Sequence, residues 1–416
     1  MKRANILFLI NVLSGIGFSI FLPLFPSIGI KNGLNDSFIG LIIGIFYLPN
    51  ILISPFNPSA LQNFKRIKLL YLATFGEAAT ILLYGFLSFI NINSFYQFLV
   101  LMIIARIMHG FCSRLIKTSV FSLTIFSSIP SEVQKKLSNV KKGWCIGLIL
   151  GPILASIFNK GTKYHLSFLI IGVLLFVSFF LSTKVSNKIE SNEEISGEMP
   201  LKFLFKKEII FILGTFFFGY ISKSYFYPCL VNNLEKIFNL SFNFSILFFL
   251  IIPISNEIVI RYLDLFISKF GFYGTSFIGL LIISLGILMI GPYSLFSKHI
   301  LSVIIVLFLI GGGEAIISIP GLFLLTISLK DIDPNIDEQK LNEISSSIHF
   351  FITNIFEFLG PIIGGFLSTI LGFKNCCLTI SSFILLYCIF YYIHFHKYIL
   401  EDFKRKKNIE NKTKIN

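Results

Sequence analysis

Six ionisable residues stand inside long apolar stretches of this 416-residue chain: Glu77, Arg106, Lys223, Glu257, Glu314 and Glu357. A charge in hydrocarbon is unfavourable unless a partner compensates it, so such residues mark functional sites by default. A carboxyl group in a low-dielectric environment is able to hold a proton near neutral pH. A carboxyl that binds and releases a proton, as its access changes from one side of a membrane to the other, can couple solute movement to protons.

Four of these residues are expected at one depth. Arg106 lies about 10 residues into its apolar stretch, and Glu257, Glu314 and Glu357 lie about 13 to 14 residues into theirs; at about 1.5 Å per helical residue these positions fall near the middle of a roughly 30 Å hydrocarbon layer. Glu357 is the first candidate for proton coupling or substrate binding, because Gly360 and Pro361 follow it closely. For each glutamate, a structural hydrogen bond to a neighbouring helix is the alternative.

The other charged positions carry different expectations. Glu314 is the second candidate, because the three glycines before it permit close helix approach or local unwinding. Glu77 is expected nearer the inner surface, in a structural role. Glu257, Arg261 and Asp264 share one helical face by their spacing, and so predict an internal pair or a cytoplasmic gate. Lys223 is expected to pair with a glutamate or to extend its ammonium group to the membrane surface.

Twelve apolar stretches must position these residues. The chain is 55% hydrophobic and only 13% charged, so lipid must solvate most of its surface. The sequence predicts an all-α membrane protein with twelve transmembrane helices in two pseudo-symmetric six-helix bundles. The predicted spans are 4–27, 37–57, 69–90, 95–125, 140–160, 165–183, 207–230, 244–267, 272–293, 299–329, 344–371 and 374–397. The corresponding regions are an N-terminal bundle (1–183), a cytoplasmic linker (184–206), a C-terminal bundle (207–397) and a basic cytoplasmic tail (398–416).

The basic residues predict the orientation. With both termini in the cytoplasm, 27 of the 35 Lys and Arg residues lie in the cytoplasmic segments or at the span ends that adjoin them, and two, Arg106 and Lys223, lie deep within spans. The six on the opposite side are Lys31, Lys160, Lys163, Lys236, Lys298 and Lys374. Positive charge accumulates on the cytoplasmic side of membrane proteins. The net charge of +14 therefore reflects topology and gives no reason to expect a nucleic-acid partner.

Small-residue motifs link the two halves. GPILAS begins at Gly151 and GPIIGG at Gly360, and their prolines, Pro152 and Pro361, lie 209 positions apart, about half the chain length. Six-helix halves related by such a repeat are typical of secondary transporters. Together with Gly147, these four residues are predicted to form helix-packing contacts.

On these residues the chain resembles the major facilitator superfamily. The stretch from Arg106 to His109-Gly110 resembles the motif R-x-x-Q-G, and Gly147 to Pro152 is similar to the antiporter motif G-x-x-x-G-P. In the second half, Gly279–Gly286, Gly291-Pro292, Ile344–Ser347 and Glu357–Pro361 look closest to vesicular amine and polyamine transporters. After the second span, Asn63-Phe-Lys65-Arg66 keeps the basic charge of the family motif but lacks its Asp and Gly. The resemblance implies a proton-coupled exporter that acts as a monomer.

The leading functional hypothesis is an antiporter that exchanges protons for a small organic solute, such as an amine or drug-like cation. The first alternative is a facilitator or symporter of a neutral or anionic solute, with Arg106 and Lys223 binding it. The second is a receptor or scaffold that transports nothing. An enzyme is not expected, since no nucleotide-binding, zinc-protease or serine-hydrolase motif occurs. No cofactor is expected either, and the six cysteines, none in a CxxC pair, predict neither a metal site nor disulfides.

Overall fold

The computed structural model describes residues 3–53, 66–89, 94–126, 132–159, 164–185, 204–293 and 299–413. Every regular secondary-structure element within these ranges is a helix, and none is a strand. The predicted all-α fold is therefore confirmed. Most of the predicted linker at 184–206 lies outside the described residues, and so does the segment 54–65, which contains Asn63.

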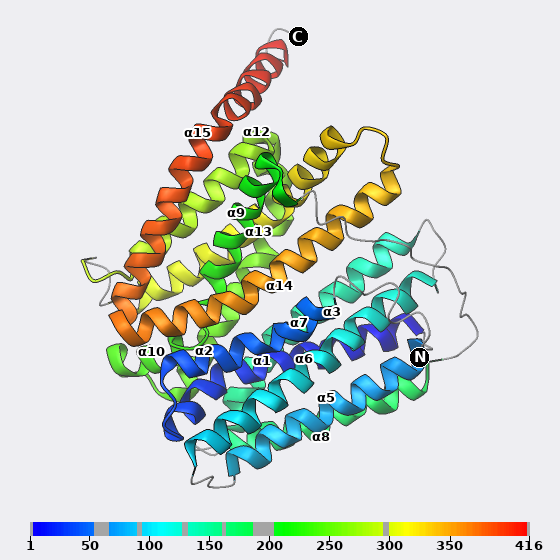
Figure 1. Cartoon of the computed structure of the whole chain (residues 1–416), viewed down its shortest axis with the longest axis vertical. Coiled ribbons are helices and arrows are strands. Elements are labelled where there is room, and N and C mark those ends of the chain that lie inside the picture. The colour runs from blue at the N-terminus through cyan, green and yellow to red at the C-terminus, as the bar shows by residue number, and fades with distance from the viewer. Residues whose placement is uncertain are drawn as a thin grey trace. The chain divides into compact units, whose positions relative to one another are not determined.

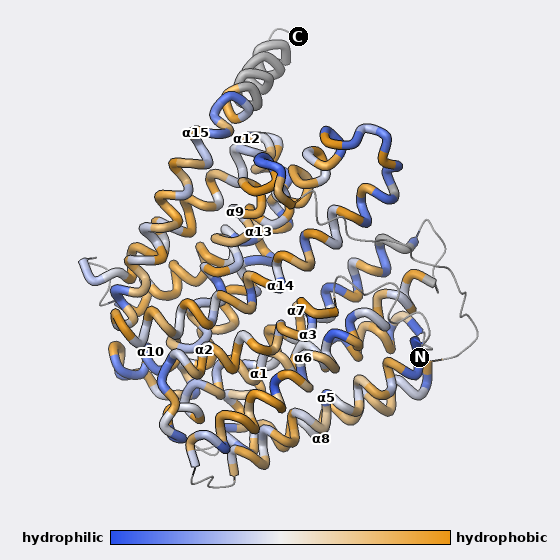
Figure 2. The backbone as a smooth tube through the Cα atoms, viewed as in Figure 1, coloured by the Kyte–Doolittle hydropathy of each residue, from blue (hydrophilic) through white to orange (hydrophobic). Residues whose placement is uncertain are grey.

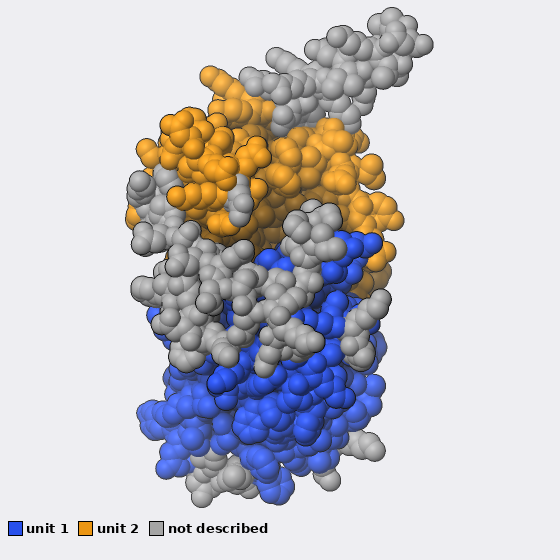
Figure 3. Space-filling model, turned by 90° about the vertical axis from the view of Figure 1, so that its right-hand side faces the viewer, with its two compact units in different colours: residues 1–198, 227–250, 361–369 blue, residues 199–226, 251–360, 370–416 orange. Residues whose placement is uncertain are grey.

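The chain forms two compact units (Figure 3). Unit 1 comprises residues 1–198, 227–250 and 361–369, and unit 2 comprises residues 199–226, 251–360 and 370–416. Unit 1 thus contains two segments from the second half of the sequence. The boundaries predicted for the bundles, the linker and the tail stay predictions.

Unit 1 is built on six long helical segments (Figure 1). Helix α1 packs against α7, and α5 packs against both α6 and α8. Unit 1 also contains three short elements, α10, α11 and η5, and the segment 361–369. The bounds are α1 (Arg3–Lys31), α2 (Asp36–Gly44) continuing through η1 (Ile45–Tyr47) into α3 (Leu48–Ile53), α5 (Arg66–Phe89), α6 (Phe95–Phe126), α7 (Val133–Phe158), α8 (Tyr164–Thr183), α10 (Leu230–Phe238), α11 (Phe242–Ile246) and η5 (Leu247–Leu250).

Unit 2 contains α9 (Lys207–Ser224), α12 (Ile251–Leu288), α13 (Ile300–Ile332), most of α14 (Glu338–Leu371) and α15 (Phe373–Thr413). Helix α9 stops earlier than the predicted seventh span, which ran to residue 230. A turn over residues 225–229 follows it. Pro228 lies in that turn, and a proline disfavours helical backbone at the residue before it.

Apolar residues extend along most of each long helix, while polar residues gather toward the ends (Figure 2). Within the described ranges, ten helical segments are long and apolar enough to cross a membrane. One of them, 242–288, covers the eighth and ninth predicted spans, and α9, with three charged residues among its 18, supplies the seventh. Their order matches the twelve predicted spans. Helix α15 runs on to Thr413 instead of ending near 397, because no Gly or Pro interrupts this stretch.

Helices α1 and α7 pack closely against each other at Gly15 and Gly147. A Cβ atom added to Gly147 would lie 2.7 Å from the Cα atom of Gly15, and the Ser19 hydroxyl donates to the Gly147 carbonyl oxygen at 3.1 Å. Small residues let membrane helices approach closely enough for such contacts. Gly151 also packs against Ser19, and Pro152 lies in the same helix.

Helix α12 is bent, and both of its arms pack on α13. The bend is at Gly271, whose φ of 68° and ψ of 179° suit a residue without a side chain. Gly312 of α13 faces Ser255 and Val259 of one arm, and Gly313 faces Ile283 of the other. The glycines before Glu314 therefore serve close packing on two helical segments at once.

Adding one methyl group at the crossing of α1 and α7 should destabilise unit 1. We predict that Gly147→Ala lowers stability by about 1–3 kcal/mol, because the new Cβ overlaps Gly15. The measurement is the thermal unfolding temperature of the purified full-length protein in detergent. The matched control is Ile146→Ala on the same helix, since the Ile146 side chain is exposed. Equal unfolding temperatures for Gly147→Ala and the control would contradict the packing described.

Candidate functional site

Unit 2 holds one lysine between two glutamates. The Lys223 ammonium nitrogen lies 2.7 Å from Glu314 Oε1 and 2.9 Å from Glu357 Oε1. The side chains are 15%, 10% and 20% exposed, respectively, so the group is largely withdrawn from the surface. We call these three residues the unit 2 triad.

Three helices position the triad. Lys223 is in the last turn of α9, where a cation also interacts favourably with the helix dipole. Glu314 is held by the glycine packing of α13 against α12. Glu357 lies three residues before Gly360, which packs against Ser224, the neighbour of Lys223. The close approach at Gly360 therefore brings the Glu357 carboxylate to the lysine.

Aromatic groups border the triad. The Lys223 nitrogen lies 5.1 Å from the centroid of the Tyr220 ring, one turn earlier on α9. The Tyr220 hydroxyl lies 3.5 Å from His349 Nε2, and the His349 ring packs edge-on against Phe216 with centroids 4.7 Å apart. A cation over a tyrosine face gains electrostatic stabilisation when it is partly desolvated. The Lys223 ammonium group thus has an aromatic ring beside it in addition to the two carboxylates.

Unit 1 holds a separate buried network. Arg106 Nη1 lies 3.1 Å from His109 Nδ1, and His109 Nε2 lies 3.8 Å from Glu77 Oε1. The Ser14 hydroxyl donates to the same carboxylate oxygen at 2.6 Å. The rings of Phe21 and Phe46, together with that of Phe18, surround the guanidinium group, with centroids 3.9, 4.6 and 5.8 Å from its carbon atom. Residues Ser14, Glu77, Arg106 and His109, which we call the unit 1 network, are fully buried.

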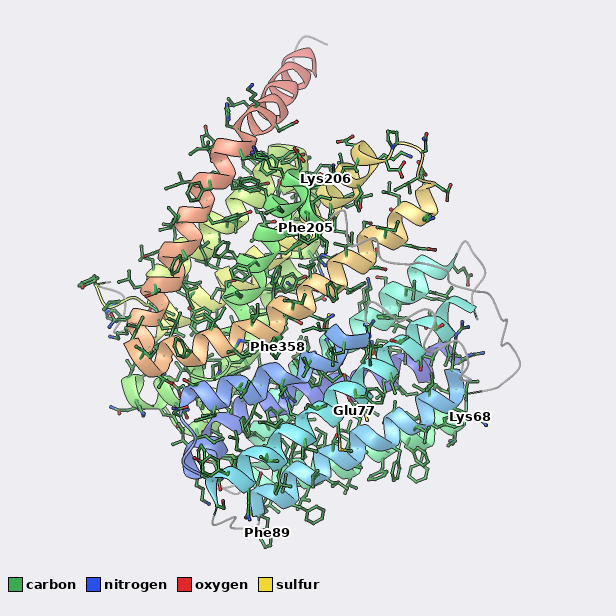
Figure 4. All side chains as sticks on the ribbon, in the orientation of Figure 1. Lys68, Glu77, Phe89, Phe205, Lys206 and Phe358 are labelled. Atoms are coloured by element: carbon green, nitrogen blue, oxygen red, sulfur yellow. The ribbon has the colours of Figure 1, made fainter. Side chains whose placement is uncertain are left out.

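The structure groups the predicted residues differently from the sequence analysis. Glu77 lies midway along α5, between Lys68 near one end and Phe89 at the other (Figure 4), because α5 begins at Arg66 and not near residue 69. It contacts the network of Arg106, which the sequence analysis did not anticipate. The only indication of this contact in the sequence is that Glu77 and His109 are polar residues inside the third and fourth predicted spans.

Glu257 does not join either group. It is partly exposed on α12, and Arg261 and Asp264 are exposed. Of the ion pairs formed by the described residues, none links Glu257 to Arg261 or Asp264. The predicted internal pair is absent because all three side chains lie away from the α12 face that packs on α13, the face of Ser255 and Val259.

The packing motif of the second half is divided between the units. Gly360 contacts Ser224 in unit 2, whereas the Pro361 carbonyl group contacts Gly40 of α2 in unit 1. Further along the same segment of α14, the Ser368 hydroxyl donates to Asp36 at 2.7 Å. This end of α14 therefore packs on the beginning of α2.

A profile of the Major Facilitator Superfamily matches residues 7–331. No curated protein matches the sequence significantly. A mutant of the nucleoside transporter NupG has a similar structure, with a TM-score of 0.76 and 12% identity over 95% of this chain and 100% of that one.

A bacterial homologue of the human lysosomal transporter Spinster, inward-facing and unoccupied, is also similar in structure. Its TM-score is 0.74, at 12% identity, over 96% of this chain and 97% of that one. These identities are low, so the structural likeness establishes the fold alone. The sequence profile covers well over half of the chain, and it agrees with the fold and with the apolar helices. The chain therefore belongs to the Major Facilitator Superfamily, as a multi-pass membrane transporter of small molecules and not an enzyme.

Proposed function

We propose that this transporter exchanges protons for a small organic cation, and that the unit 2 triad is where the two compete. The observation that carries the proposal is one ammonium group shared by two carboxylates, at 2.7 and 2.9 Å. With all three groups ionised, the triad has a net charge of −1. A site with a net charge of −1 in low-dielectric surroundings becomes neutral by binding one proton or one external cation.

Lys223 acts in this proposal as a resident cation. An amine substrate has the same charge and hydrogen-bonding groups as the lysine side chain, so it can take over one of the two carboxylates. The Tyr220 ring offers the displaced or incoming ammonium group a second contact. A proton on Glu357 or Glu314 removes the attraction for the substrate. Proton binding and substrate binding are then mutually exclusive at the triad.

The surrounding helices support a site that changes access. Helix α9 ends next to Lys223, and the glycines of α13 precede Glu314 directly. Interrupted helices and glycine contacts near the middle of the membrane are common where transporters bind their substrates. We also propose that both termini are cytoplasmic, from the distribution of Lys and Arg, and that the protein acts as a monomer. The likeness to amine and polyamine transporters favours an amine as the cation.

Removing one carboxylate should abolish exchange. In liposomes containing the full-length protein and an internal pH indicator, with an acidic interior, adding spermidine or tetraphenylphosphonium outside should release internal protons. We predict that Glu357→Gln reduces this proton release at least tenfold, because the triad then has no uncompensated charge. The matched control, Glu338→Gln, changes an exposed glutamate at the start of the same helix and should behave like the wild type. Undiminished exchange by Glu357→Gln would remove this residue from the mechanism.

Ligand-induced stabilisation separates cation transport from the alternative of a neutral or anionic solute. A ligand that binds the folded state raises the unfolding temperature as its concentration increases. We predict that amines raise it for the wild type, and that monocarboxylates and sugars do not. Stabilisation by carboxylates alone would contradict the proposal and favour a site built around positive side chains.

Lys223 should be required for stability as long as both carboxylates are present. We predict that Lys223→Met destabilises the protein by up to about 3–5 kcal/mol, because two buried carboxylates then face each other without a cation. Adding Glu314→Gln and Glu357→Gln to Lys223→Met should recover most of the loss, since no charge remains. The unfolding temperature measures both effects. If the triple variant were no more stable than Lys223→Met, charge pairing would not explain the stability.

A further inference from the structure

We infer that Glu77 is a second proton-binding site, in unit 1, and that it takes up its proton on Oε2. The inference rests on the contacts of the unit 1 network and does not depend on the function proposed for the unit 2 triad. Four observations carry it: the direction of the hydrogen bond from Arg106, the orientation that this bond imposes on His109, the contacts of Glu77, and the burial of all four side chains.

The contact between Arg106 and His109 determines where the imidazole carries its hydrogen atom. A guanidinium group only donates hydrogen bonds, so His109 Nδ1, 3.1 Å from Arg106 Nη1, must accept. The single hydrogen atom of a neutral imidazole is then on Nε2. The Tyr84 hydroxyl, 3.3 Å from both Nδ1 and the Ala105 carbonyl oxygen, is compatible with this arrangement, because it can donate to either atom.

The N–H group of the His109 ring is thus at Nε2, the ring nitrogen that faces Glu77. Nε2 is 3.8 Å from Glu77 Oε1 and has no hydrogen-bond partner among the described residues. Oε1 accepts from Ser14, whereas Oε2 is buried and accepts no hydrogen bond within the part of the chain that the structure describes. An ionised carboxylate with an unpartnered oxygen in a fully buried place is unfavourable. The carboxyl group of Glu77 therefore has a vacant position for a proton.

The proton balance of the network follows from these contacts. Without the additional proton, Arg106 carries +1, His109 is neutral and Glu77 carries −1. An added proton cannot bind Nδ1, since Arg106 donates to that atom, and it forms an O–H bond at Glu77 Oε2 instead. The network then has a net charge of +1, located on a guanidinium group that lies against the faces of Phe21 and Phe46. Aromatic faces stabilise a desolvated cation by about 2 kcal/mol or more.

Few other ionisable groups act on Glu77. Helix α1 contributes Ser14, and α8 contributes the apolar Leu175, which like Glu77 lies next to Gly17. The ionisable residues facing the carboxyl group come from α5 and α6: Tyr84, Arg106, His109, Cys112 and Lys117. Lys117 places its ammonium nitrogen 3.5 Å from the centroid of the Trp144 ring. Glu77 is thus the only carboxyl group in this set, and a proton bound there is held by one residue.

A proton on Glu77 should change the interactions that connect α1, α5 and α6. Glu77 on α5 attracts the Nε2–H group of His109 on α6 more strongly while it is ionised, because a carboxylate oxygen carries more negative charge than the carbonyl oxygen of a carboxylic acid. It accepts from Ser14 on α1 in either state. Protonation therefore weakens the interaction between Glu77 of α5 and His109 of α6, and it leaves the hydrogen bond from Ser14 of α1 in place.

Infrared titration of the full-length protein in lipid bilayers tests the site directly. A protonated carboxyl group has a C=O stretching band separate from that of a carboxylate. We predict that Glu77→Gln, made in a Glu314→Gln/Glu357→Gln background, removes one such band from the pH titration. Glu338→Gln in the same background should leave that band. An unchanged band in Glu77→Gln would overturn the inference, whatever the transport assay shows for the triad. Should Glu77→Gln not fold, Glu77→Asp retains a carboxyl group that is one methylene shorter, and the band must then shift in frequency; an unshifted band would also overturn the inference.

A matched pair of variants tests the positioning role of His109. In His109→Gln, the side-chain amide can accept from Arg106 and donate toward Glu77, so the midpoint of the Glu77 band should stay close to that of the wild type. His109→Leu can do neither, and the midpoint should move by about one pH unit or more. The same midpoint in both variants would show that His109 does not position the proton on Glu77.

Discussion

A charge that enters the hydrocarbon layer must find a partner within the protein, and this constraint organises both polar groups of the molecule. Unit 2 satisfies it by direct pairing, with one lysine between two glutamates. Unit 1 satisfies it indirectly, because a neutral histidine separates Arg106 from Glu77. Direct pairing leaves the triad with one uncompensated negative charge, whereas the network of unit 1 is neutral until it binds a proton. The two groups therefore differ in net charge before they bind a proton, −1 for the triad and zero for the unit 1 network.

Such pairing requires helices that approach closely, and small residues make the approach possible. Gly360 lets α14 contact α9 beside Ser224, which brings Glu357 to Lys223. Gly312 and Gly313 let α13 contact both arms of α12, which fixes the helix that carries Glu314. In unit 1, Gly15 and Gly147 do the same for α1 and α7. A larger side chain at these crossings would separate groups whose distances of 2.7 and 2.9 Å depend on the contact. The polar chemistry of the protein thus rests on its apolar packing.

Hydropathy was sufficient to predict the helices, because a membrane-spanning segment must satisfy its backbone internally and cover itself with apolar side chains. The same pattern does not say which polar residues meet. Lys223, Glu314 and Glu357 were each recognised as exceptional, and pairing of Lys223 with a glutamate was one of two expectations for it. The contact of Glu77 with His109 joins residues 32 positions apart in different helices, and the sequence indicates only that each is a polar residue inside an apolar span, not that the two meet. The spacing of Glu257, Arg261 and Asp264 predicts an internal pair or a cytoplasmic gate, but no ion pair among the described residues links them, and Arg261 and Asp264 are exposed.

The chain contains one tryptophan, Trp144, which lies in unit 1. Its ring has the Lys117 ammonium group over one face, and its centroid is 5.7 Å from that of Phe18, a neighbour of Arg106. The tryptophan fluorescence of the protein therefore comes from Trp144 alone. A rearrangement of unit 1 that moves Lys117 or Phe18 away from this ring should alter that emission. The molecule thus contains a built-in optical probe of the surroundings of Trp144 in unit 1.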